Sequence, residues 1–271
     1  MAEQFREFIE TALAEASEIA VNSFGKVMGS AKAGHDQNHV LTETDLAIGK
    51  LIVEKISAAY PEHNIIDEEA GVIDNKSEYT WVIDPIDGTS SFVAGSPLYG
   101  IMMGLLKDDV PIAGGVSQPS LGELYLTESG AGATLNDKPI AVSSEVKLTD
   151  VLVAHQMDSH PDDPELTRRE AALLGEIVLG IRNLRGSNSC IDVTFAARGT
   201  YGGALNHTSM IWDNVALHAL MVEAGGIYTD FLGQPIDFSD PLHKVDTNFT
   251  FCAAAPQLHT QLQEIIHRGD S

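Results

Sequence analysis

Asp84 and Asp87 are spaced as ligands of a divalent metal ion would be, and Glu68 and Asp213 offer further carboxylate oxygens from two other segments of the chain. Asp84 ends an apolar run at 81–83, and Asp87 follows it three residues later. Carboxylate oxygens are the ligands that Mg²⁺ prefers, and two or more cations would offset the repulsion among four clustered anions. The pattern therefore indicates a metal centre that acts on a phosphoryl group.

The residues between and after Asp84 and Asp87 predict the local structure of this site. Pro85 biases Asp84 toward an extended conformation and is expected to stop the strand, so that Asp84 stands at its open end. The amides of Gly88, Thr89 and Ser90 follow at the point where a helix would begin. Because N–H groups in a first helical turn have no intrahelical acceptor, we expect a phosphate site beside the metal ions.

The elements that position these residues are predicted from hydrophobic spacing and turn signals. Helical spacing occurs at 4–24, 44–58, 164–175, 191–198, 212–224 and from Pro256 onward. Apolar runs typical of strands occur at 65–66, 81–83, 101–106, 112–116, 123–126, 177–179, 227–228 and 249–253, with a Gly-rich meander over 122–140. Since no long linker or repeat interrupts the chain, we expect a single layered α+β domain over residues 1–271.

Composition argues against several classes of function. The 271 residues carry a formal charge of −23, from 39 acidic residues against 16 Lys and Arg, which disfavours nucleic acid and anionic membranes as partners. No apolar run approaches the ~20 residues of a membrane span, and the N-terminal residues lack the pattern of a signal peptide. Cys190 and Cys252, the only cysteines, are expected to be buried free thiols. We therefore expect a cytoplasmic protein.

Three segments resemble the inositol monophosphatase family of magnesium-dependent, lithium-sensitive phosphatases. Residues 84–89, Asp-Pro-Ile-Asp-Gly-Thr, resemble its first signature, and 212–216 followed by 223–226 resemble its second. Residues 65–69 resemble the family's metal-binding segment, with Asp67 where glycine is usual. The order and spacing of these segments fit the family from about the first helix to near the C-terminus.

The fold implied by this resemblance is the α+β, layered αβαβα sandwich of the inositol monophosphatase and fructose bisphosphatase type. An N-terminal lobe of about residues 1–145 would carry the metal site at 84–89. A C-terminal lobe of about residues 146–271 would supply Asp213.

The resemblance also implies how the metal ions are held. The first Mg²⁺ would be held by Glu68, Asp84 and the carbonyl oxygen of Ile86. The second would be held by Asp84, Asp87 and Asp213. Glu68 would also reach a third, weaker ion, giving two or three Mg²⁺ ions per site.

The catalytic roles implied by the family centre on a metal-bound water that attacks the phosphorus. Glu68 and Thr89 would orient or deprotonate this water, and Asp45 would hydrogen-bond the Thr89 hydroxyl. The amides of Gly88 and Thr89 would bind the phosphate, where their dipoles oppose the charge of the transition state.

The substrate pocket departs from the family pattern. Asn206 stands seven residues before Asp213, where members that cleave inositol phosphates commonly carry Glu, and the segment 185–190 also differs. Asn206, Ser187 and Ser189 are the expected contacts to the alcohol part of the substrate. Inositol monophosphate is the default substrate, while histidinol phosphate, fructose 1,6-bisphosphate and adenosine 3′,5′-bisphosphate are alternatives. Asn206→Glu is expected to favour inositol monophosphate over other esters.

Two rival hypotheses for the function rest on the same residues, and the family resemblance implies an oligomeric state. A catalytically silent metal-binding homologue is disfavoured because every expected ligand is present. An aspartyl-phosphate mechanism needs a partner two residues from the nucleophile, whereas Asp84 and Asp87 are three apart with Pro85 between them. The family implies a homodimer, for which the apolar strands within 101–126 are the expected surface.

Overall fold

The computed structural model of the chain describes residues 5–26, 29–31 and 40–269. The helices are α1 (Phe5–Ser23), α2 (Glu43–Ala59), α3 (Thr89–Val93), α4 (Pro164–Gly180), α5 (Ile191–Ala197), α6 (Ile211–Glu223) and α7 (Pro256–Gly269). Single 3₁₀ turns are η1 (Pro119–Leu121), η2 (Leu148–Asp150) and η3 (Pro241–His243). The helix predicted at 4–24 is α1, and residue 4 itself lies outside the described residues.

The strands form two main sheets and one small pair. The 8-stranded sheet runs, in spatial order, β10 (Lys138–Pro139), β9 (Gly132–Leu135), β8 (Glu123–Glu128), β7 (Val110–Gln118), β6 (Gly100–Lys107), β5 (Tyr79–Asp87), β3 (Asn64–Asp67) and β4 (Gly71–Ile73). The 5-stranded sheet runs β12 (Asn183–Arg185), β11 (Leu152–Gln156), β13 (Gly203–Ser209), β15 (Phe249–Ala254) and β14 (Ile227–Thr229). Strands β1 (Ser30–Ala31) and β2 (Val40–Leu41) pair separately.

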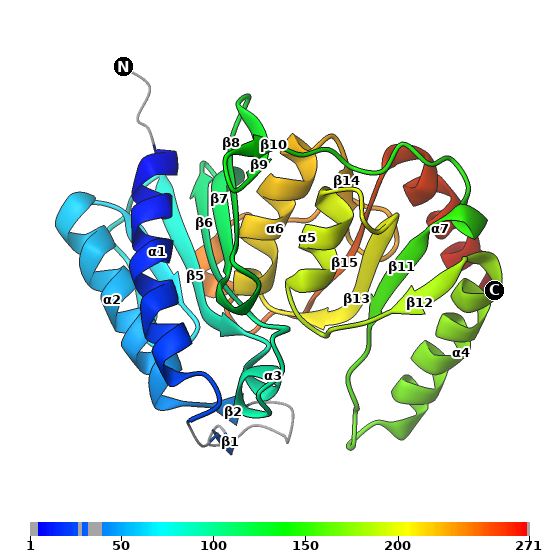
Figure 1. Cartoon of the computed structure of the whole chain (residues 1–271), viewed down its shortest axis with the longest axis horizontal. Helices are drawn as coiled ribbons and strands as arrows, with labels where there is room; N and C mark the ends of the chain where they lie inside the picture. The colour runs from blue at the N-terminus through cyan, green and yellow to red at the C-terminus, as the bar shows by residue number, and fades with distance from the viewer. Residues whose placement is uncertain (1–4, 27–28, 32–39, 270–271) are drawn as a thin grey trace.

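These elements stack in five layers (Figure 1). Helices α1 and α2 cover one face of the larger sheet, because α1 buries residues at helical spacing, among them Ile9, Leu13 and Ala16. Helices α5 and α6 lie between the two sheets, and α4 and α7 cover the outer face of the smaller sheet (Figure 1). The predicted αβαβα sandwich is therefore confirmed.

One apolar core cluster connects the two sheets. It contains Met102 and Val116 from the larger sheet together with Ala154 and Ala204 from the smaller one. Residues from both sequence halves therefore share a core. The boundary between an N-terminal and a C-terminal lobe stays a prediction.

Strand β5 carries Asp84 and Asp87, and it ends later than the sequence predicts. The strand continues through Pro85 to Asp87, instead of stopping before Pro85. Its pairing with β6 shifts register between Asp84 and Asp87, so these residues flank a bulge. A bulge lets proline sit within a strand and turns neighbouring side chains to new directions. Asp84 and Asp87 thereby reach one site from a single strand.

The second half of the chain holds the main errors of the sequence prediction. The apolar run 177–179 is the last turn of α4 and not a strand, because Ile177 packs inward from a helix that ends only at Gly180. Strands β11 and β13 were not predicted, although they are neighbours in the smaller sheet. The apolar run 151–154 at β11 was overlooked, and β13 mixes apolar with polar residues, so it lacks the apolar run that marks a buried strand.

Helix α6 packs unusually close to the larger sheet, and glycine allows it to. A Cβ atom added at Gly104 of β6 would lie 2.7 Å from Cγ1 of Val215 and 2.8 Å from the backbone nitrogen of Ala216. At Gly114 of β7 it would lie 3.0 Å from the Ala216 backbone. Because α6 carries Asp213 in its first turn, these two glycines determine how close this candidate metal ligand lies to the larger sheet.

Gly104→Ala is expected to destabilise the protein by about 1–3 kcal/mol, because the added methyl group must push α6 away from the sheet. Urea unfolding followed by circular dichroism measures this change. Gly175→Ala is the matched control: this exposed position in α4 has no atom within 4 Å of the added carbon, and alanine favours helix. Equal stability of the two variants would contradict the close packing of α6.

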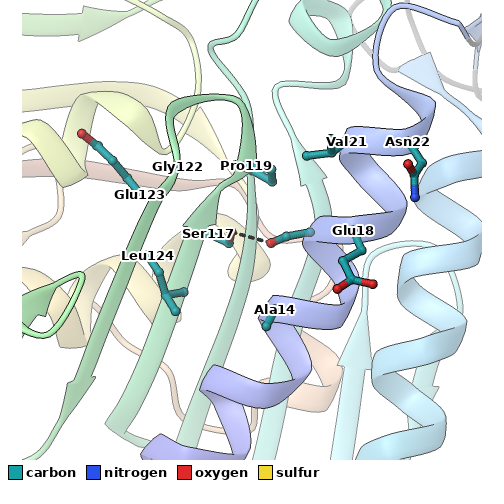
Figure 2. A pocket seen from close by; sticks show the side chains of 10 residues that line it. Ala14, Glu18, Val21, Asn22, Ser117, Pro119, Gly122, Glu123 and Leu124 are labelled. Atoms are coloured by element: carbon teal, nitrogen blue, oxygen red, sulfur yellow. Dashed lines mark hydrogen bonds between the residues drawn. The ribbon is translucent and has the colours of Figure 1, made fainter.

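A pocket of about 410 Å³ lies on another part of the molecule, between α1 and strands β7 and β8 (Figure 2). Ser17 Oγ and Ser117 Oγ are 2.6 Å apart beside it. The pocket shares no lining residue with the carboxylate cleft described below. Nearby, strands β6 and β7 are largely buried within the sheet, so most of the segment 101–126 is not free to form the predicted dimer surface.

Candidate active site

The candidate site is a cleft of about 470 Å³ that runs between the two sheets. The structure brings nearly every residue predicted for the site to its lining: Glu68, Asp84, Ile86, Asp87, Gly88, Thr89, Ser187, Ser189, Asn206 and Asp213. Asp45 is absent from the lining and lies behind Thr89, which it contacts. Residues that are far apart in the sequence therefore converge on one cleft.

Three carboxylates form the most compact group in this cleft. Oxygen atoms of Asp84, Asp87 and Asp213 lie within 4.8 Å of one another. Asp84 is only 2% exposed, and its Oδ1 has no hydrogen-bond partner. A buried carboxylate oxygen without a donor is unfavourable unless a cation or proton satisfies it. The donor set therefore fits a divalent metal ion.

Burial and mutual repulsion perturb the acidity of all three groups. Burial raises the pKa of Asp84 well above its usual value, and the nearby charge of Glu68 adds to the shift. Burial likewise raises the pKa of Asp213, with repulsion from Asp87 as a further cause. The pKa of Asp87 rises to about 6, chiefly through burial. A bound cation would reverse these shifts, because it favours the ionised carboxylates.

Backbone N–H groups fix the orientation of two of these carboxylates. The amide of Met210 donates to Asp213 Oδ2 at 2.6 Å, because Asp213 is the third residue of α6 and reaches back to its N-cap. The amide of Cys190 donates to Asp87 Oδ2. One oxygen of each carboxylate is thus held by the protein.

Thr89 and Asp45 form a second polar group beside the cluster. The Thr89 hydroxyl lies 2.8 Å from the carbonyl oxygen of Ile86 and 3.3 Å from Asp45 Oδ1. Asp45 is buried and also accepts from the backbone N–H and hydroxyl of Thr42, the N-cap of α2. Capping therefore fixes the carboxylate that lies beside the Thr89 hydroxyl, which is the contact that the family resemblance implied.

Gly88 makes the turn between β5 and α3. Its φ of 81° lies in the left-handed region, which only glycine adopts without strain. A Cβ atom there would also lie 3.0 Å from the carbonyl oxygen of Leu98 and from Cβ of Ser189. The Gly88 and Thr89 amides thus stand at the start of α3, next to Asp87.

Asn206, which also lines the cleft, is held by the protein. Its Nδ2 donates to Gln156 Oε1 at 2.8 Å and to the carbonyl oxygen of Thr208 at 2.7 Å, and its Oδ1 accepts from the Thr208 amide. Both amide hydrogens are therefore used within the protein. Only a second lone pair on Oδ1 is left for a substrate hydroxyl.

Several cleft residues were missed in the sequence, and Gln156 is the most connected of them. It is the last residue of β11, a strand whose apolar run at 151–154 was overlooked. Asp158, Ser159 and His160 follow it in the same lining. Position is a second signal, because ligands of such sheets bind beyond the carboxyl ends of parallel strands.

Comparison with known proteins agrees with this geometry. The sequence profile described as the inositol monophosphatase family matches residues 1–268. The chain belongs to the inositol monophosphatase family. It is 35% identical over 233 residues to a probable inositol 1-monophosphatase of Mycobacterium tuberculosis, covering 84% of this chain and 82% of the relative. It is 32% identical over 220 residues to a histidinol-phosphatase of Chlorobaculum parvum, covering 81% and 83%.

The fold of this inositol monophosphatase family member also matches solved structures. The extragenic suppressor protein SuhB of Bartonella henselae superposes with a TM-score of 0.87, at 24% identity, over 97% of this chain and 98% of that one. Among the helices of the described residues, none combines the length and apolar character needed to cross a membrane. Cys190 and Cys252 are buried free thiols, as predicted.

Proposed function

We propose that this family member is a Mg²⁺-dependent phosphomonoesterase whose default substrate is inositol monophosphate. The observation that carries the proposal is the group of three carboxylates within 4.8 Å, with an unpartnered buried oxygen on Asp84. The relative from Mycobacterium tuberculosis, named a probable inositol 1-monophosphatase, supports the choice of substrate. In an enzyme that cleaves phosphate esters, such a cluster would hold the metal ions that stabilise charge on the phosphoryl group.

The proposed metal ligands are Glu68, Asp84, Asp87, Asp213 and the carbonyl oxygen of Ile86, for two or three Mg²⁺ ions. Bound Mg²⁺ would stabilise charge on the phosphoryl oxygens and increase the acidity of water. Glu68 supports this assignment because its charge raises the pKa values of Asp84, Asp87 and Asp213.

The remaining residues would hold the phosphate and orient the attacking water. The amides of Gly88 and Thr89 would donate to phosphoryl oxygens, since they stand at the start of α3 beside Asp87. Glu68 and the Thr89 hydroxyl would orient the water, and the Glu68 carboxylate would accept its proton. Asp45 would keep the Thr89 hydroxyl in place through their 3.3 Å contact.

The alcohol part of the substrate would lie toward Ser187, Ser189 and Asn206, which line the same cleft. Inositol offers hydroxyl groups to these side chains and to the free lone pair on Asn206 Oδ1. Histidinol phosphate is the second candidate, because Asp158 and Asp246 add carboxylates to the cleft that would attract an ammonium group. The relative named histidinol-phosphatase supports it as well.

A phosphate-release screen tests the proposed function. The purified protein, supplied with Mg²⁺, is given inositol 1-phosphate, histidinol phosphate, fructose 1,6-bisphosphate, adenosine 3′,5′-bisphosphate and 4-nitrophenyl phosphate. The highest kcat/KM is expected for inositol 1-phosphate. A clear preference for histidinol phosphate would replace the default substrate by the second candidate, and no hydrolysis of any ester would refute the proposal.

Lithium at millimolar concentration is expected to inhibit hydrolysis, because Li⁺ would replace the Mg²⁺ held by Asp84, Asp87 and Asp213 and retain the product. Rates are measured over a lithium titration at modest Mg²⁺, with matched NaCl as the control for ionic strength. An unchanged rate across the titration would refute this metal arrangement while leaving phosphatase activity standing.

We further propose a cytoplasmic location and a homodimer. Two buried free thiols suit a reducing compartment. The family implies the dimer, and light scattering at micromolar concentration tests it, with a stable monomer as the contradicting result.

A further inference from the structure

Gln156 connects two parts of the cleft that are distant in sequence. It is 7% exposed and lies between the segment 187–189 and Asn206. Its Nε2 donates to the carbonyl oxygen of Ser189 at 2.7 Å and to Asp192 Oδ2 at 3.2 Å. Its Oε1 accepts from Asn206 Nδ2 at 2.8 Å. One side chain thus links both groups of residues expected to contact the alcohol.

The strand order explains why Gln156 holds this position. Strand β11 pairs in parallel with β12 on one side and with β13 on the other. Gln156 ends β11 directly beside Asn206 of β13, and the segment 186–190 leaves the neighbouring strand β12. The carboxyl ends of parallel strands face the same edge of a sheet, where ligands bind. Gln156 is therefore central to this edge.

The hydrogen bonds through Gln156 have a fixed direction. A carbonyl oxygen and an ionised carboxylate can only accept, so Ser189 and Asp192 require the NH₂ group of Gln156 to face them. The oxygen of Gln156 must then face Asn206, which must present its own NH₂ group. Asn206 Oδ1 is left to face the Thr208 amide. The identity of each residue thus determines the orientation of the next.

The segment 186–190, which follows β12, also contacts the carboxylate cluster. Asp192 accepts from the Ser187 amide through both oxygens, at 3.1 and 3.0 Å. Cys190, the residue after Ser189, donates its amide to Asp87. Because Gln156 binds both Ser189 and Asp192, it holds this segment from two points, and the segment in turn contacts Asp87.

We propose that Gln156 is a positioning residue that determines which alcohols the cleft accepts, by fixing Asn206 as an acceptor and holding the segment 187–190. The proposal rests on the proposed function and identifies a specificity determinant within that site. Gln156 acts through Asn206 and Ser189, so its loss is expected to change the KM for polyol esters more than the rate of phosphate cleavage.

The proposal changes the expectation for Asn206→Glu. An ionised Glu side chain only accepts, so its oxygen would face the Gln156 oxygen. If the Gln156 amide rotated, its oxygen would face Asp192 and the Ser189 carbonyl. Two acceptors would then still face each other, at these residues instead of at position 206. Asn206→Glu alone is therefore expected to impair hydrolysis of inositol 1-phosphate. Adding Gln156→Met removes the opposing oxygen and should restore part of the loss.

Steady-state kinetics on inositol 1-phosphate and 4-nitrophenyl phosphate test these effects. For Gln156→Met we expect KM for inositol 1-phosphate to rise about tenfold, because the three hydrogen bonds of Gln156 are lost, with kcat for 4-nitrophenyl phosphate changed less than about twofold. Asn206→Ala should give a similar KM, and the double variant Asn206→Ala with Gln156→Met should lose no more than either alone. Additive losses, or equal losses on both substrates, would overturn the proposal.

The matched control is Gln118→Met. Gln118 is also fully buried and donates to Thr194 at 2.6 Å, but it does not line the cleft. It is expected to lower stability without changing the ratio of KM values. A similar change of that ratio in both variants would mean that Gln156 supports only the fold, and would overturn the proposal.

Hydrogen exchange provides a readout that does not depend on activity. In Gln156→Met, the amides of 186–190 are expected to exchange about tenfold faster than in the wild-type protein, while those of β6 stay unchanged. If the wild-type protein hydrolysed none of the esters, the proposed function would be refuted. The exchange measurement would still test whether Gln156 holds the segment 186–190, because it does not depend on activity. Unchanged exchange in 186–190 would overturn that role.

Discussion

Asp84→Asn is expected to lower kcat by about 10³-fold or more, because several kcal/mol of metal stabilisation depends on this carboxylate. Asp84 is the most buried of the three clustered acids, and its Oδ1 has no protein donor. It is also the proposed ligand shared by two ions, so its replacement weakens both. Phosphate release from inositol 1-phosphate at saturating Mg²⁺ measures the effect.

Two controls separate loss of metal from loss of fold. Asp84→Asn removes a repelling charge, so its metal-free melting temperature should not fall, while the rise in melting temperature on adding Mg²⁺ should shrink. Asp109→Asn, in the turn between β6 and β7 where its φ of 64° suits asparagine, should behave as wild type. Near-normal turnover of Asp84→Asn would refute its assignment as a metal ligand.

Thr89→Val is expected to lower kcat by about 10²-fold, since it removes the hydroxyl proposed to orient the attacking water. Valine keeps the size and branching of threonine, and Thr89 is only partly buried, so the fold should tolerate the change. The lost contacts are those to the Ile86 carbonyl at 2.8 Å and to Asp45 at 3.3 Å. Steady-state kinetics with 4-nitrophenyl phosphate isolates this effect from recognition of the alcohol.

Thr89→Ser is the matched control, because it keeps the hydroxyl and should retain most of the activity. If Val and Ser at this position reduced kcat equally, the methyl group and not the hydroxyl would matter. Full activity of Thr89→Val would remove Thr89 from the proposed catalytic group.

The larger sheet and the carboxylate cluster could be predicted from sequence because their signals are local. Strands β3 and β5 carry apolar runs that end at Asp67 and at Asp84, and the first turn of α6 carries Asp213. The bulge that lets β5 continue through Pro85 could not be predicted, since it depends on pairing with β6. The local pattern thus predicted which carboxylates cluster but not the geometry of the strand that carries two of them.

The alcohol end of the cleft was harder to predict because it depends on register. Gln156 and Asn206 are fifty residues apart and meet only because β11 and β13 pair in parallel. Strand β13 carries polar residues that line the cleft, which weakens the apolar pattern that marks a strand, whereas the apolar run 151–154 at β11 was overlooked. The error at 177–179 has a related cause, because three consecutive apolar residues suit a helix end as well as a short strand.

The central claim is that the carboxylate cluster serves metal-dependent cleavage of a phosphate monoester. The most direct test is phosphate release from inositol 1-phosphate by the purified protein, first with a chelator and then after Mg²⁺ is restored. We predict no release above background with the chelator and full recovery with excess Mg²⁺. An equal rate in the chelator would contradict the claim.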